Sequence, residues 1–361
     1  MGYYPNKAIF PGKILARSLE REGMTQKNLS ERTGLSEKHL SQIINGEAPI
    51  TVETALLLEN ALGGSASFWI NLEKNFQETK ARIERTLNLK KEAPLVKAFP
   101  YSELVRLGFV EQTSNIDKKV ENLWKFFGVN SLLSVQETES MAFAVAYRKR
   151  SSSKIKKEAI AAWLRCGELL SKKDKLPNYS ESGLKQSLDK VKNLTTLEPK
   201  DFSSKAQEML SENGVSLVYL PHFAGTGVSG AVRWLNDTPL IQLSLFGTYA
   251  DMFWFNLFHE LGHLLLHGKK DEFIIFEKGK GLLPGNEDKE KEADEFASKE
   301  LLPAKEYEEF LKKGDISKTA VSQFALSINR DPGIVEGRLC HDKLVKWNKP
   351  LGFRKQLRFA P

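Results

Sequence analysis

Cysteine is scarce in this sequence of 361 residues, and its two copies, Cys166 and Cys340, lie far apart. This spacing excludes both a disulfide framework and a CxxC metal pair. Long apolar runs are also missing, since no stretch approaches the roughly 18 residues that span a membrane. The opening residues, MGYYPNKAIFPGK, lack the apolar core of a secretory signal. The sequence therefore predicts a cytoplasmic protein with no membrane partner.

An excess of one charge is absent from the first part of the chain, although the whole sequence has a net charge of +7. Residues 1–77 contain eight Lys/Arg and eight Asp/Glu, whereas residues 78–200 contain 24 and 15. The basic middle region could strengthen attraction to DNA phosphates. It could equally form a solvated helical surface, and the sequence leaves both interpretations open.

The length and the 41% hydrophobic composition allow two or three domains, each with its own core. Residues 11–77 have the pattern of five short helices separated by glycine-containing turns. Thr25 and Ser36 are the expected N-caps of the second and third helices, and we expect Ser67 to begin the fifth. Residues 78–205 form a mainly helical and basic middle region by the same criteria.

The pattern changes near residue 213, where short apolar runs replace the helical periodicity. Strands are predicted at residues 215–220, 231–234, 240–245 and 273–276. A long apolar helix is predicted over residues 248–267, and another helix over residues 286–302. We therefore expect domains at residues 1–77, 78–205 and 206–345, followed by a tail at residues 346–361.

Residues 25–46, TQKNLSERTGLSEKHLSQIING, have the spacing of a helix-turn-helix. Gly34 suits the tight turn between the two helices. At 100° per residue, Leu40, Ile43 and Ile44 share the inner face of the second helix. The polar residues therefore point outward, and this pattern predicts binding to double-stranded DNA.

The expected DNA contacts are polar side chains of the types that bond base edges and phosphates. They comprise Thr25, Gln26, Ser36, Lys38, His39, Ser41, Gln42 and Asn45. The alternative interpretation is a small helical domain without a DNA role. The neutral charge of residues 1–77 also argues against strong non-specific binding.

Residues 259–263, HELGH, form an HExxH motif inside a strongly apolar segment. One helical turn separates His259 from His263, so both imidazoles can bind a single zinc ion. Glu260 lies beside them and can take a proton from the attacking water and pass it to a leaving amine. The sequence therefore predicts a catalytic zinc site with Glu260 as the base.

The third metal ligand is expected on the helix that contains EKEADEFASKELLP. Ala293, Ala297 and Leu301 define its buried face, and at 100° per residue Glu290 falls within that arc. Glu292 falls outside the arc and remains the less favoured alternative. Asp294 lies one turn beyond Glu290 and is the expected residue that orients a histidine ligand.

Three other histidines are candidates that the spacing does not favour. His267 lies one turn past His263, which does not fit the six-residue spacing of a metzincin, so we expect it to bond near the helix end. His222 follows a strand and is more simply structural. His341 lies beside Cys340, but no other ligand spacing supports a second metal there.

Two family resemblances accompany these motifs. The segment from PGKILARSLEREGMTQ to FWINLEKNF resembles the Cro/phage-repressor-like helix-turn-helix family, and within it HigA-type antitoxins. The segments FWFNLFHELGHLLLHG, EKEADEFASKELLP and DPGIVEGRLCHDKLVKW resemble ImmA/IrrE metallopeptidases. The first resemblance implies a homodimer on a palindromic operator and a possible cognate toxin. The second implies a zinc-dependent peptidase, of a family whose relatives cleave helix-turn-helix repressors.

The sequence therefore predicts a multi-domain fold. We expect an all-α helix-turn-helix domain, a mainly helical middle region, and an α+β zincin-like metallopeptidase domain with a small sheet. The expected function is a transcription regulator, an antitoxin of a type II toxin–antitoxin module, with one Zn²⁺ per chain and a protein substrate. Alternatively, the peptidase-like domain only binds zinc, a toxin or a signal. A dedicated protease localised by its DNA-binding part is a third hypothesis.

Overall fold

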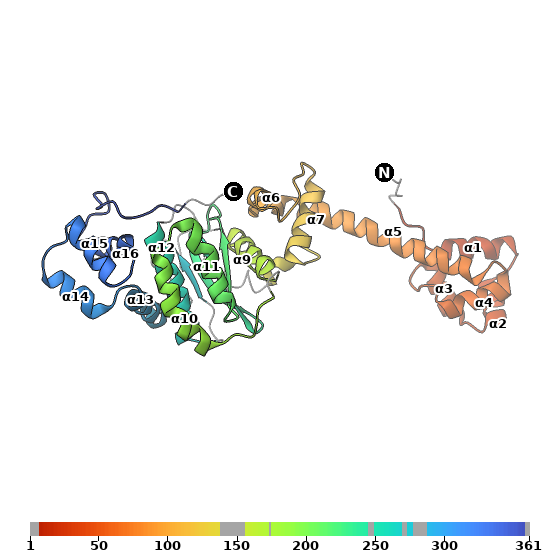
Figure 1. The fold of residues 1–361 in the computed structure, drawn as a ribbon. Helices are drawn as coiled ribbons and strands as arrows, with labels where there is room; N and C mark the ends of the chain where they lie inside the picture. The colour runs from red at the N-terminus through yellow and green to blue at the C-terminus, as the bar shows by residue number, and fades with distance from the viewer. Residues whose placement is uncertain are drawn as a thin grey trace. The chain divides into compact units, whose positions relative to one another are not determined.

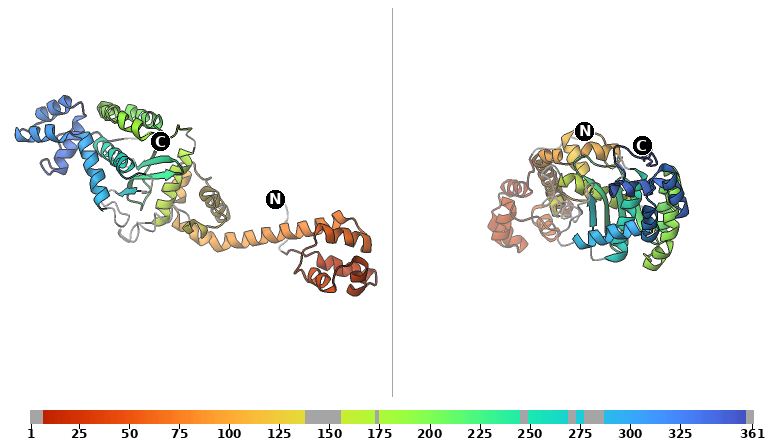
Figure 2. Two further views of the ribbon diagram at one scale, coloured as in Figure 1. Left: turned by 90° about the horizontal axis from the view of Figure 1, so that it is seen from below. Right: turned by 90° about the vertical axis from the view of Figure 1, so that its left-hand side faces the viewer.

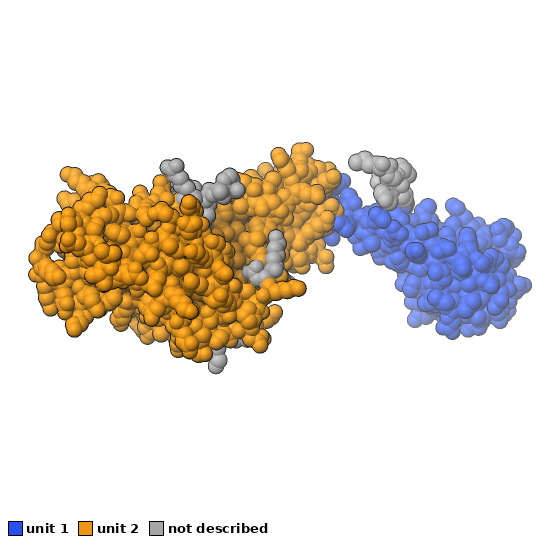
Figure 3. All heavy atoms as spheres, viewed as in Figure 1, with its two compact units in different colours: residues 1–94 blue, residues 95–361 orange. Residues whose placement is uncertain are grey.

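The computed structural model describes residues 7–137, 156–172, 175–244, 249–268, 273–276 and 287–357. Two compact units divide the chain, residues 1–94 and residues 95–361 (Figure 3). The boundaries expected at residues 77, 205 and 345 stay predictions. No helix in the described ranges combines the length and the hydropathy that a bilayer crossing requires.

The described residues of unit 1 form helices joined by short turns (Figure 1). They are α1 (Gly12–Arg21), α2 (Gln26–Thr33), α3 (Glu37–Asn45), α4 (Val52–Leu62) and α5 (Ala66–Glu92). Thr25 and Ser36 cap α2 and α3 as expected, since their hydroxyls accept from Asn28 N–H and His39 N–H. The fifth helix begins at Ala66, one residue before the expected Ser67. Ser65 caps α5, because its hydroxyl accepts from Phe68 N–H.

The crossing of α2 and α3 depends on small residues at the turn. Gly34 has a φ of 74°, in the left-handed region that favours glycine. The Ser30 hydroxyl donates to the Leu35 carbonyl at 2.6 Å and closes the turn from the α2 side. Leu40 and Ile43 are buried in the core of unit 1. The crossing therefore leaves the opposite side of α3 to the polar residues.

Unit 2 combines helices with a four-stranded sheet (Figures 1 and 2). Its helices before the sheet are α6 (Tyr101–Arg106), α7 (Ile116–Phe127), α9 (Lys157–Ser171), α10 (Glu181–Asn193) and α11 (Pro199–Ser211). Three short 3₁₀ helices accompany them: η1 (Ala93–Ala98), which begins in unit 1, η2 (Ser134–Glu137) and η3 (Leu194–Thr196). The helices after it are α13 (Glu287–Leu301), α14 (Ala304–Lys312), α15 (Lys318–Ser327) and α16 (Pro332–His341). α12 (Ala250–Leu266) lies between β3 and β4 in sequence.

The sheet has the order β1-β3-β2-β4. Its strands are β1 (Ser216–Leu220), β2 (Val228–Leu235), β3 (Thr238–Ser244) and β4 (Phe273–Phe276). β1 is parallel to β3, whereas β2 is antiparallel to both β3 and β4. The fold class expected from the sequence is therefore confirmed: helical domains with a small mixed sheet. The expected end of the third strand, residue 245, lies outside the described residues.

Helices cover both faces of the sheet. Because successive side chains of a strand point to opposite faces, each strand contacts helices on both sides. On one face, Gln242 donates to the Trp163 carbonyl of α9 at 2.7 Å, and Arg233 donates to the Leu164 carbonyl at 2.9 Å. On the other face, Ile241 and Leu243 join the apolar core that includes α12. The apolar helix with the HExxH motif is thereby held against the centre of the sheet.

The C-terminal tail is fixed to the fold by a buried carboxylate. Glu336 of α16 accepts the backbone N–H groups of four consecutive tail residues, Leu351, Gly352, Phe353 and Arg354. The Arg354 guanidinium then donates to Asp251 of α12 at 2.9 Å and lies 4.1 Å from the centre of the Tyr249 ring. These contacts tie the tail to both α16 and the first turn of α12.

Candidate functional site

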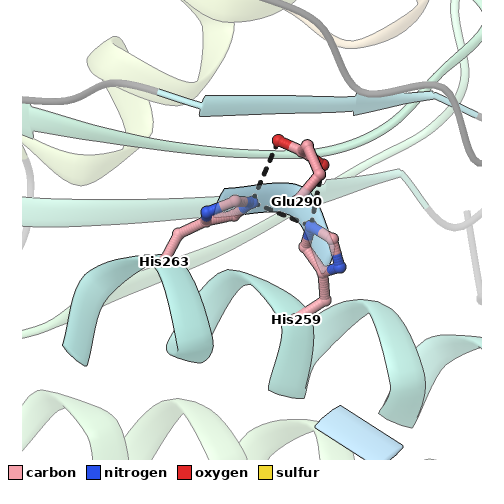
Figure 4. Close-up of side chains that lie close together, drawn as sticks. All are labelled: His259, His263 and Glu290. Carbon is pink, nitrogen blue, oxygen red and sulfur yellow. Dashed lines mark hydrogen bonds and ion pairs between the residues drawn. The ribbon is translucent and has the colours of Figure 1, made fainter. Parts of the chain in front are cut away.

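His259, His263 and Glu290 converge on one point between α12 and α13 (Figure 4). The Nε2 atoms of the two histidines are 2.8 Å apart. Glu290 Oε2 lies 3.3 Å from His259 Nε2, and its Oε1 lies 3.3 Å from His263 Nε2. The turn of helix that separates the histidines places both rings on one side of α12, as their spacing predicts. Glu290 reaches them from the first turn of α13.

Close packing of α12 and α13 brings the Glu290 carboxylate within reach of the two histidines. Gly262 makes this possible, because a Cβ there would lie 3.1–3.3 Å from Phe296 and Ala293 of α13. Asp294, one turn beyond Glu290, holds His259 from the outer side through Nδ1, at 2.7 Å. This bond leaves the Nε2 atom of His259 facing His263 and Glu290.

The electrostatics of the three residues follow from burial and from their mutual bonds. Burial lowers the pKa of His259, but its bonds to Asp294 and Glu290 outweigh this effect and raise the pKa to about 9. Burial lowers the pKa of His263 to about 4. Burial raises the pKa of Glu290, but bonds to the two histidines outweigh it and lower the pKa to about 2.

Glu260 is the most enclosed acid of the site. Its exposed fraction is 0%, and within the described residues neither carboxyl oxygen has a hydrogen-bond partner. Burial raises its pKa well above the ordinary range for glutamate. A buried acid without a partner is costly for stability, which points to a role beyond packing.

The donor set fits a zinc ion. Two imidazole nitrogens and one carboxylate form the His₂Glu set of catalytic zinc sites, which keep a fourth position open. One ligand atom from each residue lies within 4.8 Å of the others. The Asp294–His259 bond supplies the carboxylate that such histidines usually carry on the second ring nitrogen.

The less favoured candidates lie elsewhere. Glu292 is 60% exposed, and its Oε2 lies 3.6 Å from His267 Nδ1. His267 Nε2 lies 3.2 Å from the Lys289 carbonyl, a contact near the end of α12. His341 is exposed beside Asp342. His222, in the loop after β1, is not among the three clustered residues.

The eight residues expected to contact DNA are exposed or half-buried around α2 and α3. The hydroxyls of Thr25 and Ser36 also serve as helix caps. Asn45 donates to the Ser41 hydroxyl at 3.4 Å on the same side of α3. Lys38 is exposed and Gln42 half-buried, one turn apart, on the side of α3 away from Leu40 and Ile43. α3 thus offers a polar outer face.

Two features of the site escape sequence reasoning. Gly230 of β2 lies against Glu260, so close that a Cβ there would overlap Oε1 of the acid. A glycine within a strand signals close approach of another group, but the strand was expected to begin only at Ala231. The Asp251–Arg354 bond joins residues with no recognisable common motif.

Comparison with known families assigns both ends of the chain. Residues 15–69 match a helix-turn-helix family, and residues 231–328 match the IrrE N-terminal-like domain of peptidase family M78. The second match contains the His259, His263 and Glu290 cluster.

Several individual proteins are similar to the N-terminal part. Virulence-associated protein I of Dichelobacter nodosus is 29% identical over 79 residues, which is 22% of this chain and 73% of that protein. Two solved structures align with 24% of this chain. A putative antidote protein of a plasmid maintenance system from Nostoc punctiforme is 28% identical. The alignment covers 93% of that protein's chain, with a TM-score of 0.23. An addiction module antidote protein of the HigA family from Coxiella burnetii is 30% identical. The alignment covers 95% of that protein's chain, with a TM-score of 0.22.

The family matches agree with the geometry described above. The helix-turn-helix match covers α2 and α3, and the peptidase-family match covers the HExxH helix α12 together with α13. The chain thus combines an XRE-type helix-turn-helix domain at its N-terminus with an IrrE-like domain of peptidase family M78 at its C-terminus.

Proposed function

We propose that this protein is a DNA-binding transcription regulator whose C-terminal domain is a zinc-dependent endopeptidase. The observation that carries the proposal is the convergence of His259, His263 and Glu290, with Glu260 on the same helix as the two histidines. One such cluster among the described residues supports one zinc ion per chain.

The proposed reaction is hydrolysis of a peptide bond. When bound, zinc would polarise the peptide carbonyl and lower the pKa of the attacking water to about 7. Glu260 accepts a proton from that water as the C–O bond forms, and delivers it to the nitrogen as the C–N bond breaks. Asp294 keeps the His259 ring oriented through the bond to Nδ1.

The substrate class follows from the kind of bond that is cut. A peptide bond can reach the site only where the chain that contains it is extended and exposed. We propose a flexible segment of a protein: a helix-turn-helix repressor, a partner protein or another part of this chain. The resemblance to ImmA/IrrE peptidases supports a repressor in particular.

The proposed regulatory partner is double-stranded operator DNA. A single helix-turn-helix reads only half of a palindromic site, so we propose a homodimer. The resemblance of the N-terminal segment to HigA-type antitoxins supports an antitoxin of a type II module, with a cognate toxin as a further partner. Because such a regulator must reach its operator DNA, we propose that it acts in the cytoplasm.

One experiment tests the peptidase directly. The full-length protein is purified, its zinc content is measured, and it is incubated with a helix-turn-helix repressor and by itself, followed by intact-mass analysis. We expect cleavage by the zinc-loaded protein, none after chelation, and recovery when zinc is restored. Cleavage that persists without metal would contradict the assignment.

A second candidate function is a domain that binds zinc, a toxin or a signal without cleaving peptides. The complete burial of Glu260 favours it, because a base must reach the water that it activates. Zinc-loaded protein that retains operator binding, but leaves every tested substrate intact, would support this candidate over the peptidase.

A further inference from the structure

His267 follows α12 directly and extends the row of histidines along one side of that helix. It lies one turn after His263, just as His263 lies one turn after His259. The ring centres are 4.6 Å apart for His259 and His263, and 5.3 Å apart for His263 and His267. The cluster that fits a metal ion contains the first two histidines but not the third. The row therefore places a third imidazole beside the candidate metal centre with a different task.

The His267 ring is bonded to the peptide unit that leads into Glu290. Its side chain is 3% exposed, and its Nε2–H donates to the Lys289 carbonyl at 3.2 Å. A carbonyl oxygen only accepts, so this nitrogen carries the proton and cannot bind metal. The Lys289 carbonyl and the Cα atom of Glu290 belong to one rigid, planar peptide group. The bond therefore fixes the backbone from which the third metal ligand projects.

Contacts from α12 hold α13 on both sides of Glu290 in sequence. Gly262 lies against Ala293, three residues after Glu290. The bond from His267 to the Lys289 carbonyl lies one residue before Glu290. Glu290 itself is in the first turn of α13, and the ends of helices fray because their outer groups lack partners within the helix. Loss of the His267 bond would therefore loosen the turn that carries Glu290.

The contact between His267 and Glu292 does not account for the position of the ring as well as the Lys289 bond does. Glu292 Oε2 lies 3.6 Å from His267 Nδ1, which is too far for a hydrogen bond. The Glu292 side chain is also 60% exposed, and ion pairs at exposed positions contribute little to stability. The Lys289 carbonyl is therefore the contact through which we expect His267 to act.

We propose that His267 is a positioning residue for the zinc site: through the Lys289 carbonyl, it holds the Glu290 carboxylate against His259 and His263. This inference rests on the zinc-binding part of the proposed function and does not require peptide hydrolysis. Loss of the bond should weaken zinc binding while both histidine ligands stay in place. Partners that hold metal ligands in position typically change metal affinity by about 10–100-fold when they are removed.

Three variants of the full-length protein test the proposal, with zinc affinity measured by competition against a chelator. His267→Phe keeps an aromatic ring and removes the donor, so zinc affinity should fall about 10–100-fold. His267→Gln retains a side-chain N–H group for the same carbonyl and should recover most of that loss. His341→Phe, the matched control, makes the same substitution at an exposed position on α16 and should bind zinc as wild type does.

A double-mutant cycle with Glu290→Ala separates a positioning role from a general loss of structure. If His267 acts through Glu290, His267→Phe should lower zinc affinity far less in the Glu290→Ala background than in wild type. Thermal unfolding of the metal-free proteins measures stability separately. We expect metal-free His267→Phe to remain folded, because the ring that packs beside His263 is retained.

Three results would overturn the proposal. They are wild-type zinc affinity in His267→Phe, an affinity of His267→Gln as weak as that of His267→Phe, and additive effects of the His267 and Glu290 substitutions. Each of these results leaves the proposed peptidase standing, since wild type still binds zinc. Conversely, a wild type that binds zinc but cleaves no substrate contradicts the peptidase and leaves the role of His267 intact, so the two failures are distinguishable.

Discussion

Gly230 of β2 lies directly against the carboxyl group of Glu260 on α12. A side chain at residue 230 would occupy the space of Oε1, so the position of the proposed base depends on a glycine in the neighbouring strand. Gly230 pairs with Leu243 of β3 and with Ile275 of β4. The backbone there is fixed on both sides, and Glu260 would have to move instead.

Gly230→Ala is expected to displace Glu260 while leaving the metal ligands in place. We expect unchanged zinc content, at least tenfold slower cleavage, and a loss of about 1–3 kcal/mol in the free energy of unfolding from overpacking. Zinc analysis, cleavage rates and thermal unfolding measure the three effects. Ser229→Ala, at the adjacent half-buried position of β2, is the control and should behave as wild type. Normal cleavage by Gly230→Ala would contradict the role of this contact.

Glu290 and Glu292 offer a matched pair on one helix. Glu290→Ala removes the carboxylate that lies 3.3 Å from both histidines, so zinc should be lost. Glu292→Ala removes a 60% exposed side chain and should retain about one zinc per chain. Elemental analysis of both purified variants decides between them. Loss of metal only from Glu292→Ala would reverse the choice of ligand.

Zinc binding should release a proton from His259. In the metal-free protein the pKa of His259 is raised to about 9 by the bonds to Asp294 and Glu290, so at pH 7.5 this ring is protonated. The pKa of His263, near 4, makes that ring neutral already. Only the neutral ring binds metal, so zinc affinity should fall about tenfold for each pH unit below 9.

Calorimetry in buffers of different ionisation enthalpy measures this release. We expect about one proton per zinc at pH 7.5. Glu260→Gln serves as the control, since its amide cannot contribute a proton of its own and the release from His259 should remain. A zinc affinity that does not change between pH 6 and pH 8 would show that His259 is neutral before metal binds.

DNA binding is expected to depend on the outer face of α3. The double variant Lys38→Ala/Gln42→Ala removes two side chains that we expect to contact phosphates or base edges. Each lost base contact should cost about 1–3 kcal/mol of binding free energy. The matched control, Lys74→Ala/Gln77→Ala, removes the same residue types from α5. Operator affinity, measured by mobility shift, should fall only for the first pair. Equal affinities would remove α3 as the recognition helix.

Local patterns were sufficient for the parts of the fold that depend on residues near one another in sequence. Thr25 and Ser36 cap their helices because a hydroxyl reaches an N–H three residues along, which the sequence displays directly. The angular position of Glu290 on its helix likewise separates it from Glu292. The structure brings Glu290 to the histidines and leaves Glu292 near His267.

Contacts between distant segments could not be predicted in this way. Gly230 meets Glu260 because β2 lies over α12, and strand pairing of this kind depends on the whole sheet rather than on local pattern. The Asp251–Arg354 bond and the Glu336 bonds to the tail join segments that no periodicity relates.

The central claim is that Glu260 handles protons in peptide hydrolysis, and one comparison tests it most directly. Wild type and Glu260→Gln, each loaded with zinc to the same content, are incubated with the same repressor substrate, and the products are identified by mass. The substitution keeps the size of the side chain and removes only its ability to accept a proton. We predict that both proteins hold zinc and bind operator DNA, and that only wild type cleaves. Equal cleavage by the two proteins would contradict the account.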